Sequence, residues 1–261
     1  MRGDRAMTTG LRWFAGFSVA VLVAACSTAG SPSSAPAPGA TVTATAAAAQ
    51  PSASTPSTAV SPSASASGTR HVVGNVLGEG ALPGYTVEVP SGWSTTNAYF
   101  VTKDGPGVVI GLSVWDVAKV PTDPCHWKKH LVDPGPTVDD LARALAAQST
   151  RHATQPTDVT LAGQSGSYLE WSVPADMVVT GDSDFKGCDT WPDNGHNDFV
   201  SWLSSTGNDR YMQVAGQVDH LWILDVSGQR LVVDATYSPN ASAADQAELT
   251  AMAASIHFEV P

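Results

Sequence analysis

Short runs in which apolar and polar residues alternate dominate the sequence after residue 84. In the segment GYTVEVPSGW, Tyr85, Val87 and Val89 alternate with other residues and are followed by a Pro-Ser-Gly turn. A period of two residues is typical of half-buried β-strands. The nearly continuous apolar run at 108–117 predicts a mostly buried strand.

Three later segments each predict two strands joined by a tight turn. They are 158–174, with a Gly/Ser turn, 199–216, with a Gly-Asn-Asp turn, and 219–237, with a turn at Ser227-Gly228. The last pattern is the clearest, because two apolar runs flank the turn directly. The stretch GQSGS in the first segment lacks the final glycine of the serine-hydrolase motif, where Ser167 stands instead, so we interpret it as a turn.

Two helices interrupt the strands. Thr137 precedes Asp140 by three residues, the arrangement of a capping box, and Leu141 and Leu145 then lie on one apolar helix face. A second apolar stripe, near 241–256, predicts a helix close to the end of the chain. About eight or nine strands with these two helices predict an α+β fold, in which an antiparallel β-sheet packs against helices.

The first 25 residues have the pattern of a lipoprotein signal peptide. Three arginines precede an uncharged apolar run at 13–25, which is too short to span a bilayer comfortably and stops at Cys26. The small residues before Cys26 resemble the bacterial lipobox, in which the cysteine is diacylated and becomes the first mature residue. This resemblance implies a lipid anchor on Cys26, at the extracytoplasmic face of the cell membrane. An ordinary secretory signal cut elsewhere remains the alternative.

The residues that follow Cys26 have the composition of a spacer. Residues 27–69 are almost wholly Ser, Ala, Thr, Pro and Gly, with no charge and no aromatic ring. Such a segment buries too little apolar area to offset the entropy of ordering it. We therefore expect a disordered tether over 26–70 and a single domain over 71–261.

The charge balance excludes some classes of partner. The chain has 13 Lys and Arg against 24 Asp and Glu, a net charge of −11 at pH 7. Three of the arginines lie in the predicted signal peptide, so the remainder is more acidic still. This balance argues against nucleic-acid binding and against direct docking on anionic lipid.

Cys125 and Cys188 are the two cysteines left after lipidation of Cys26. An exported protein lies in an oxidising compartment, so we predict a disulfide between them. A pair of free thiols or a redox centre is the alternative, although no CxxC motif is present. A zinc site that combines Cys125 with His126 and His130 is disfavoured by the two lysines between the histidines.

The acidic segment 182–198 is the most ligand-rich part of the chain. Read as a calcium loop starting at Asp182, it places Lys186 at the fifth position, where an oxygen ligand is required. A different calcium site, a catalytic carboxylate pair and a solvated acidic loop remain open. The residues that would form the calcium site are Asp189, Asp193, Asn194 and Asp198. We assign no metal and no cofactor.

Two tryptophans stand beside the two cysteines. Trp127 and Trp191 either pack over the disulfide or form an exposed platform for a glycan or an apolar ligand. Together with Asp189 and Asp193 they are our candidate surface for a ligand or partner.

The strand that ends in Pro-Ser-Gly-Trp resembles the first strand of the PsbP-like α/β/α fold. The lipobox, the tether and this domain together resemble the LpqN-type lipoproteins of actinobacteria, over most of residues 84–260. The shared motifs are turns, a helix cap and a hairpin, so the resemblance implies a fold and a location but supplies no catalytic residues.

These patterns predict a membrane-anchored, extracytoplasmic lipoprotein with a non-enzymatic binding domain. Its partner would be an unidentified extracytoplasmic protein, glycan or lipid. The alternatives are a calcium-dependent or hydrolytic cell-envelope enzyme that uses the 182–198 loop, and a spacer that spans the cell wall.

Overall fold

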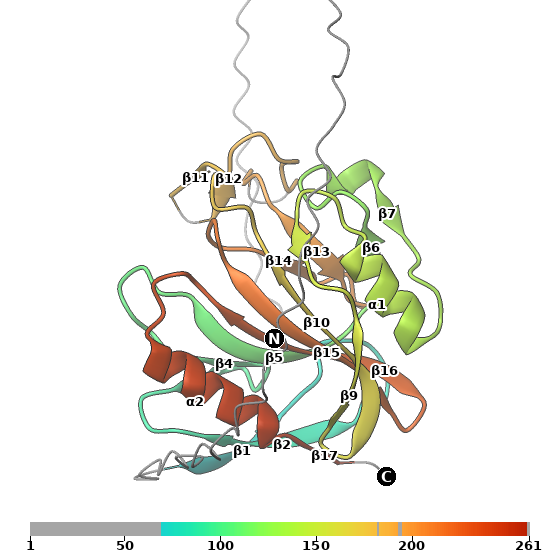
Figure 1. Ribbon diagram of the computed structural model, residues 1–261, viewed down its shortest axis with the longest axis vertical. Helices are drawn as coiled ribbons and strands as arrows, with labels where there is room; N and C mark the ends of the chain where they lie inside the picture. Colours follow the sequence, from blue (N-terminus) through green and yellow to red (C-terminus); the bar gives the residue numbers. More distant parts are fainter. Residues whose placement is uncertain (1–68, 182, 193–194, 260–261) are drawn as a thin grey trace, which may run out of the picture. The chain divides into compact units, whose positions relative to one another are not determined.

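The computed structural model describes residues 69–181, 183–192 and 195–259 (Figure 1). The predicted signal peptide, Cys26 and the tether up to residue 68 lie outside the described residues, as does Asp193. The first described strand begins at Arg70, the last residue of the predicted tether.

An eight-stranded antiparallel sheet forms the centre of the described domain. Its order is β3-β4-β5-β16-β15-β10-β8, with β9 paired to β10. The strands are β3 (Ser94–Thr96), β4 (Phe100–Thr102), β5 (Ile110–Asp116), β8 (His152–Ala153), β9 (Thr157–Leu161), β10 (Gln164–Ser172), β15 (Val218–Val226) and β16 (Gln229–Tyr237).

The hairpin predicted around Ser227-Gly228 is confirmed as β15 and β16. Nine residues of each strand pair in register, from Val218 with Tyr237 to Val226 with Gln229. Ser227 and Gly228 both have positive φ, which gives a two-residue turn whose twist matches that of the strands. This hairpin supplies the middle of the sheet, so both of its faces are covered.

One face of the sheet packs against a smaller sheet and a helix (Figure 1). The smaller sheet has the order β1-β2-β17 and consists of β1 (Arg70–Gly74), β2 (Gly84–Val89) and β17 (His257–Glu259). The helix is α2 (Ala243–Ala254), capped by Ser242. Alternate residues of the main strands, such as Leu112 and Val233, meet Tyr85 and Met252 in this core.

The other face packs against α1 (Val138–Ala146) and three small hairpin elements. Thr137 caps α1 and forms the predicted capping box with Asp140, which confirms this helix start. Leu141 and Leu145 of α1 are fully buried against β10 and β15, together with three stacked or edge-on tryptophans. The tryptophans are Trp115, Trp171 and Trp202.

The remaining elements belong to this second side. They are β6 (Val120–Pro121), the 3₁₀ turn η1 (Trp127–Lys129), β7 (Leu131–Val132), β11 (Val179–Thr180), β12 (Asp184–Phe185), β13 (Val200–Leu203) and β14 (Asp209–Tyr211). The pairs β6-β7, β11-β12 and β13-β14 are each antiparallel. Of these, β13 and β14 confirm the hairpin predicted at 199–216.

The predicted α+β class is wrong. Strand and bridge residues make up 44 % of the described residues and helical residues 13 %, with two α-helices among them, so the fold is β-rich. Both predicted helices exist, but each is short and covers one patch of the sheet. Strands and loops cover the rest of the sheet. The described residues form 17 strands, whereas the pattern predicted eight or nine. In the described part of the chain, no helix is long and apolar enough to cross a membrane.

Gly166 provides a test of how closely the central strands pack. It lies in β10, and a Cβ atom at this position would lie 2.0 Å from the carbonyl oxygen of Ile223 in β15. We expect Gly166→Ala to lower the free energy of unfolding by about 1–3 kcal/mol, because the strands must separate to admit the methyl group. Urea denaturation measures this. Ser165→Ala, at an exposed neighbour, is the control and should change stability by less than about 0.5 kcal/mol; equal midpoints for both variants would contradict the packing described.

Candidate functional site

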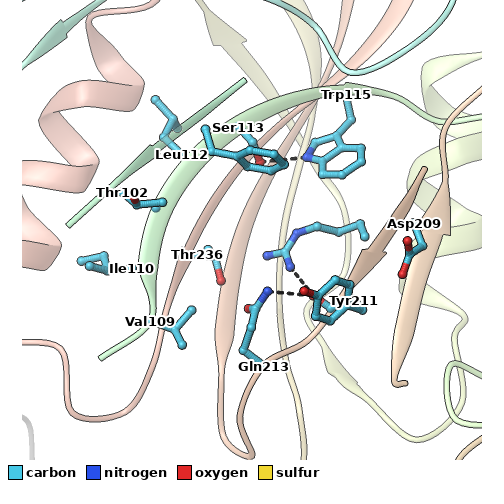
Figure 2. A pocket seen from close by; sticks show the side chains of 13 residues that line it. Thr102, Val109, Ile110, Leu112, Ser113, Trp115, Asp209, Tyr211, Gln213 and Thr236 are labelled. Atoms are coloured by element: carbon cyan, nitrogen blue, oxygen red, sulfur yellow. Dashed lines mark hydrogen bonds between the residues drawn. The ribbon is translucent and has the colours of Figure 1, made fainter. Parts of the chain in front are cut away.

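A pocket of about 220 Å³ opens between the main sheet and the small hairpin strand β14. Its sheet side comes from β4, β5 and Thr236 of β16, and its other side from Asp209, Arg210, Tyr211 and Gln213. Figure 2 shows Tyr211 and Gln213 across the cavity from Val109 and Ile110. We call it the β5–β14 pocket.

The pocket exists because β5 carries small residues on one face. Ile110, Leu112 and Val114 point into the core on the opposite face, so the alternation of the strand turns Gly111 and Ser113 toward the pocket. Gly111 has no side chain to fill the space. A Cβ atom there would lie 2.9 Å from the carbonyl oxygen of Val101, so the close approach of β4 also requires glycine.

Aromatic rings border this hollow. Phe100 and Trp115 lie edge to face with ring centroids 6.0 Å apart. The indole N–H of Trp115 donates to the Ser113 hydroxyl at 2.8 Å, which fixes the ring. Tyr211 belongs to the opposite wall and is 39 % exposed. The pocket therefore offers apolar surface on two sides.

Arg210 forms the polar base of the pocket and is almost fully buried, with 6 % of its side chain exposed. Its Nε donates to Asp234 Oδ2 at 2.5 Å and its Nη2 to Asp219 Oδ1 at 2.8 Å. Its Nη1 donates to the carbonyl oxygen of Tyr211 at 2.5 Å. Because Asp219 lies in β15 and Asp234 in β16, this one side chain ties β14 to the centre of the sheet.

Burial and the neighbouring charges shift the pKa values of these buried groups. Burial opposes the charge of Arg210, but Asp234 and Asp219 outweigh it and raise the pKa of the guanidinium. Burial also raises the pKa of the Asp234 carboxyl above its usual range, although Arg210 opposes this shift. Oδ2 of Asp219 and Oδ1 of Asp234 have no hydrogen-bond partner among the described residues. The single positive charge of Arg210 thus faces two carboxyl groups, and all three side chains are buried.

A second arginine, Arg151, is half-buried and lies close enough to Asp219, Asp234 and Arg210 to interact with their charges. Its guanidinium stacks over Trp171 at 3.9 Å and Phe199 at 4.8 Å, and its Nη2 donates to the Ser201 hydroxyl at 2.6 Å. Burial lowers the pKa of Arg151 to about 9, and the charge of Asp219 opposes that shift. The charge of Asp219 therefore acts on both arginines.

Two carboxyl groups at the hairpin add acidity near the pocket. Burial raises the pKa of Asp198 to about 6, and the charge of Asp209 adds to the shift. Burial also raises the pKa of Asp209, which lines the pocket itself.

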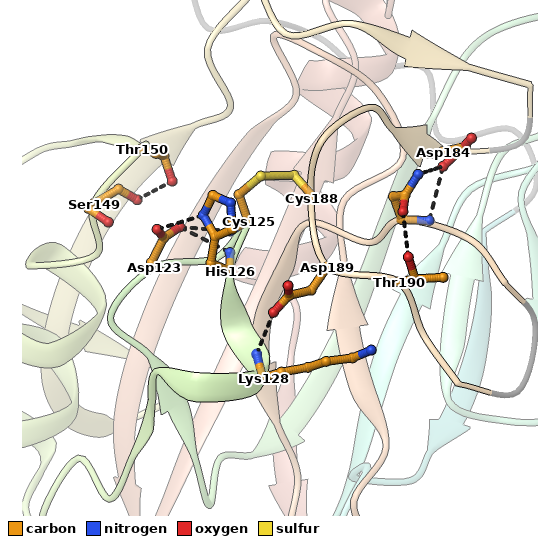
Figure 3. Close-up of a disulfide and its surroundings, with 11 residues drawn as sticks. Asp123, Cys125, His126, Lys128, Ser149, Thr150, Asp184, Cys188, Asp189 and Thr190 are labelled. Atoms are coloured by element: carbon orange, nitrogen blue, oxygen red, sulfur yellow. Dashed lines mark hydrogen bonds and ion pairs between the residues drawn. A yellow bond between two sulfur atoms is a disulfide. The ribbon is translucent and has the colours of Figure 1, made fainter. Parts of the chain in front are cut away.

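The predicted disulfide between Cys125 and Cys188 is confirmed (Figure 3). It joins two segments that also meet through their backbones: Asp189 N–H donates to the carbonyl of Cys125 at 2.7 Å, and the Asp189 carboxylate accepts from Lys128 N–H at 2.9 Å. The zinc alternative therefore loses its thiolate ligand, because Cys125 is bonded to Cys188.

The structure brings Trp127, Trp191 and Asp189 together beside this disulfide. The two indole rings stack with centroids 4.6 Å apart and an angle of 27° between their planes. Trp127 is only 6 % exposed and Trp191 is half-buried, so most of the Trp127 ring is covered rather than open to solvent. Asp193, the fourth residue of this candidate surface, lies outside the described residues.

Two carboxylates of the 182–198 loop, those of Asp184 and Asp189, accept hydrogen bonds from the protein itself. Asp184 Oδ1 accepts from the backbone and side-chain amides of Asn197 at 3.0 and 2.8 Å, and these bonds lower the pKa of Asp184. Asp189 holds Lys128, as described above. No group of three or more His, Cys, Asp or Glu side chains is placed to hold a metal ion in the described parts of the chain.

Sequence reasoning missed the β5–β14 pocket. Two signals point to it: the small residues Gly111 and Ser113 inside an apolar strand, and the acidic residues Asp219 and Asp234 in the largely apolar strands on either side of Ser227-Gly228, which require a basic partner such as Arg210. A buried charged residue requires a partner, so these three residues belong together once their strands are adjacent.

Comparison with known proteins adds no family. Neither the models of protein families nor the curated proteins contain a match to this chain. The resemblance to LpqN-type lipoproteins therefore stays a prediction.

Asp198 makes stability depend on pH. Its pKa is about 6 in the folded protein and about 4 for an unfolded aspartate, so the folded state binds the proton more tightly. The stabilisation from this proton is complete below about pH 4 and is lost as the pH rises through about 6. We expect Asp198→Asn to flatten the fall in unfolding free energy between pH 4 and 6, as measured by urea titration at several pH values. The exposed Asp176→Asn is the control and should keep the wild-type slope; an unchanged slope in Asp198→Asn would contradict the assignment.

Proposed function

We propose that this protein is a lipid-anchored, extracytoplasmic lipoprotein whose domain binds a small ligand in the β5–β14 pocket. The observation that carries the proposal is the convergence of polar and aromatic groups on one hollow of the sheet. Arg210, Gln213 and Ser113 supply polar atoms, while Phe100 and Tyr211 supply apolar walls. A mostly apolar concavity with a few fixed polar groups is the usual form of a small-molecule site.

The architecture around the pocket supports a rigid binding site. Ion pairs to β15 and β16 fix Arg210, and a hydrogen bond fixes Trp115. A ligand therefore finds groups that are already ordered, which reduces the entropy lost on binding. A non-enzymatic role fits this arrangement, since the pocket wall presents a charge-balanced arginine and no nucleophile beside a base.

The disulfide and the N-terminal pattern support the location. Disulfides persist in oxidising compartments outside the cytoplasm, so the bridge between Cys125 and Cys188 supports an extracytoplasmic location. The lipobox-like residues before Cys26 would then mark the cysteine that anchors the chain to the outer face of the cell membrane.

The anchor is tested by Cys26→Ser in the native host. We expect the protein to move from the membrane pellet to the soluble extracytoplasmic fraction, because the variant lacks the sulfur atom that carries the lipid. Immunoblots of the two fractions measure the change. Ser27→Ala, the neighbouring substitution, should stay in the pellet; a Cys26→Ser protein that pellets as fully as the wild type would refute the anchor.

The pocket is tested by Tyr211→Ala. The phenol ring is partly exposed, and the Tyr211 carbonyl that binds Arg210 is retained, so the variant should fold. We expect small-molecule fragments that raise the melting temperature of the wild type to bind the variant at least about tenfold more weakly, a loss of about 1.4 kcal/mol. Calorimetric titration of the wild-type hits measures this.

The matched control is Tyr237→Ala. Tyr237 is half-buried and packs on the opposite face of β16, so its loss should leave fragment affinity unchanged. If the affinity of every hit is equal in the wild type and in Tyr211→Ala, the ligand site lies elsewhere.

A further inference from the structure

We propose that the ligand of the β5–β14 pocket is a small uncharged amide attached to a flat or compact apolar group. The amide carbonyl accepts from the guanidinium of Arg210 and the amide N–H donates to the side chain of Gln213. This inference rests on the proposed function and names the chemical class of its ligand.

Arg210 retains donor capacity for a ligand. A guanidinium has five N–H groups, and three of them are used by Asp234, Asp219 and the carbonyl of Tyr211. The other two N–H groups have no partner among the described residues. Since Arg210 contributes to the pocket wall, an acceptor in the pocket can take one of them.

Gln213 supplies the complementary acceptor. Its Nε2 donates to the carbonyl oxygen of Tyr211 over a long 3.3 Å, and its Oε1 is buried with no hydrogen-bond partner in the described part of the chain. A buried acceptor without a donor is unfavourable, so a turn of the half-buried Gln213 side chain that brings Oε1 to a ligand N–H gains a hydrogen bond. Arg210 and Gln213 thus offer one donor and one acceptor, the complement of an amide.

The surrounding charges select against ionised ligands. The charge of Arg210 is already balanced by Asp219 and Asp234, and Asp209 adds a further carboxyl group to the wall. An anion would therefore meet more acidic than basic groups at short range. A cation would have to approach the guanidinium of Arg210 in the same small space, with like-charge repulsion. A neutral polar group avoids both effects.

The apolar part of the ligand is set by the walls. Phe100 and Trp115 stand edge to face on the sheet side and Tyr211 closes the other side, so a ring can lie between them. The volume of about 220 Å³ is below the range of about 300–1,000 Å³ that is typical for drug-sized ligands, so the occupant is small.

Four probes with the same benzene ring test this class: benzamide, acetophenone, benzoate and benzylamine. Each is titrated into the full chain with its disulfide oxidised, and binding is followed by NMR through the Arg210 Nε–H and Gln213 side-chain amide signals. We expect benzamide to shift both signals and to bind at least about tenfold more tightly than benzoate or benzylamine. Acetophenone, which keeps the carbonyl but lacks the N–H, should shift the Arg210 signal and bind more weakly than benzamide.

Gln213→Ala removes the proposed hydrogen bond between the ligand N–H and Gln213, and it leaves the buried ion pairs of Arg210 in place. In this variant we expect the affinity for benzamide to fall to that for acetophenone, whereas Gln229→Ala, at the distant β15–β16 turn, should preserve the difference. Tightest binding of benzoate or benzylamine at these signals would overturn the amide class but leave the pocket as a ligand site. Shifts of neither signal with any of the four probes would contradict both the amide class and the proposed function.

Discussion

The buried ion pairs of Arg210 organise the functional side of this domain. One guanidinium on β14 contacts carboxylates on β15 and β16, three strands whose residues are up to 24 positions apart in the sequence. Removing either side of such a buried pair leaves a charge without compensation, at about 3–5 kcal/mol. The geometry is therefore strict, and it fixes the small β13-β14 hairpin at one distance above the sheet. The β5–β14 pocket is the space that this distance leaves over Gly111 and Ser113.

The same interaction explains why the guanidinium in the pocket wall is held in one position. If Arg210 contacted only one of the two aspartates, the other would be a buried carboxylate without a positive neighbour. If Arg210 contacted neither, its charge would attract anions. Arg210 lies between two buried aspartates, and the charge of Asp219 also acts on Arg151. The low polarity of such surroundings strengthens each hydrogen bond and raises the cost of any group left unpaired.

Much of the local structure could be predicted from the sequence because its signals are local. The capping box at Thr137 and the turn at Ser227-Gly228 depend on residues within four positions, and both were confirmed. The disulfide followed from the compartment that the leader implies. The fold class was predicted wrongly because short two- and three-residue strands, such as β6 and β14, carry too few residues to show a period. The pocket was missed for a related reason: β5, β14 and β16 contribute to it, and only the three-dimensional arrangement of the strands brings Arg210 and Gly111 to the same pocket.

The position of the first strand gives the proposed anchoring a mechanical meaning. Under the proposed anchoring, a pull from the membrane would enter the described domain at β1, an edge strand held to β2 by five residue pairs. The side chain of Arg70 adds one hydrogen bond, from its Nη2 to the carbonyl of Trp93 at 2.9 Å. Tension would thus detach β1 one pair at a time, beginning with Arg70 and Val89. The main sheet and its pocket share no strand with β1, so they would keep their shape under a load that the edge of the smaller sheet absorbs.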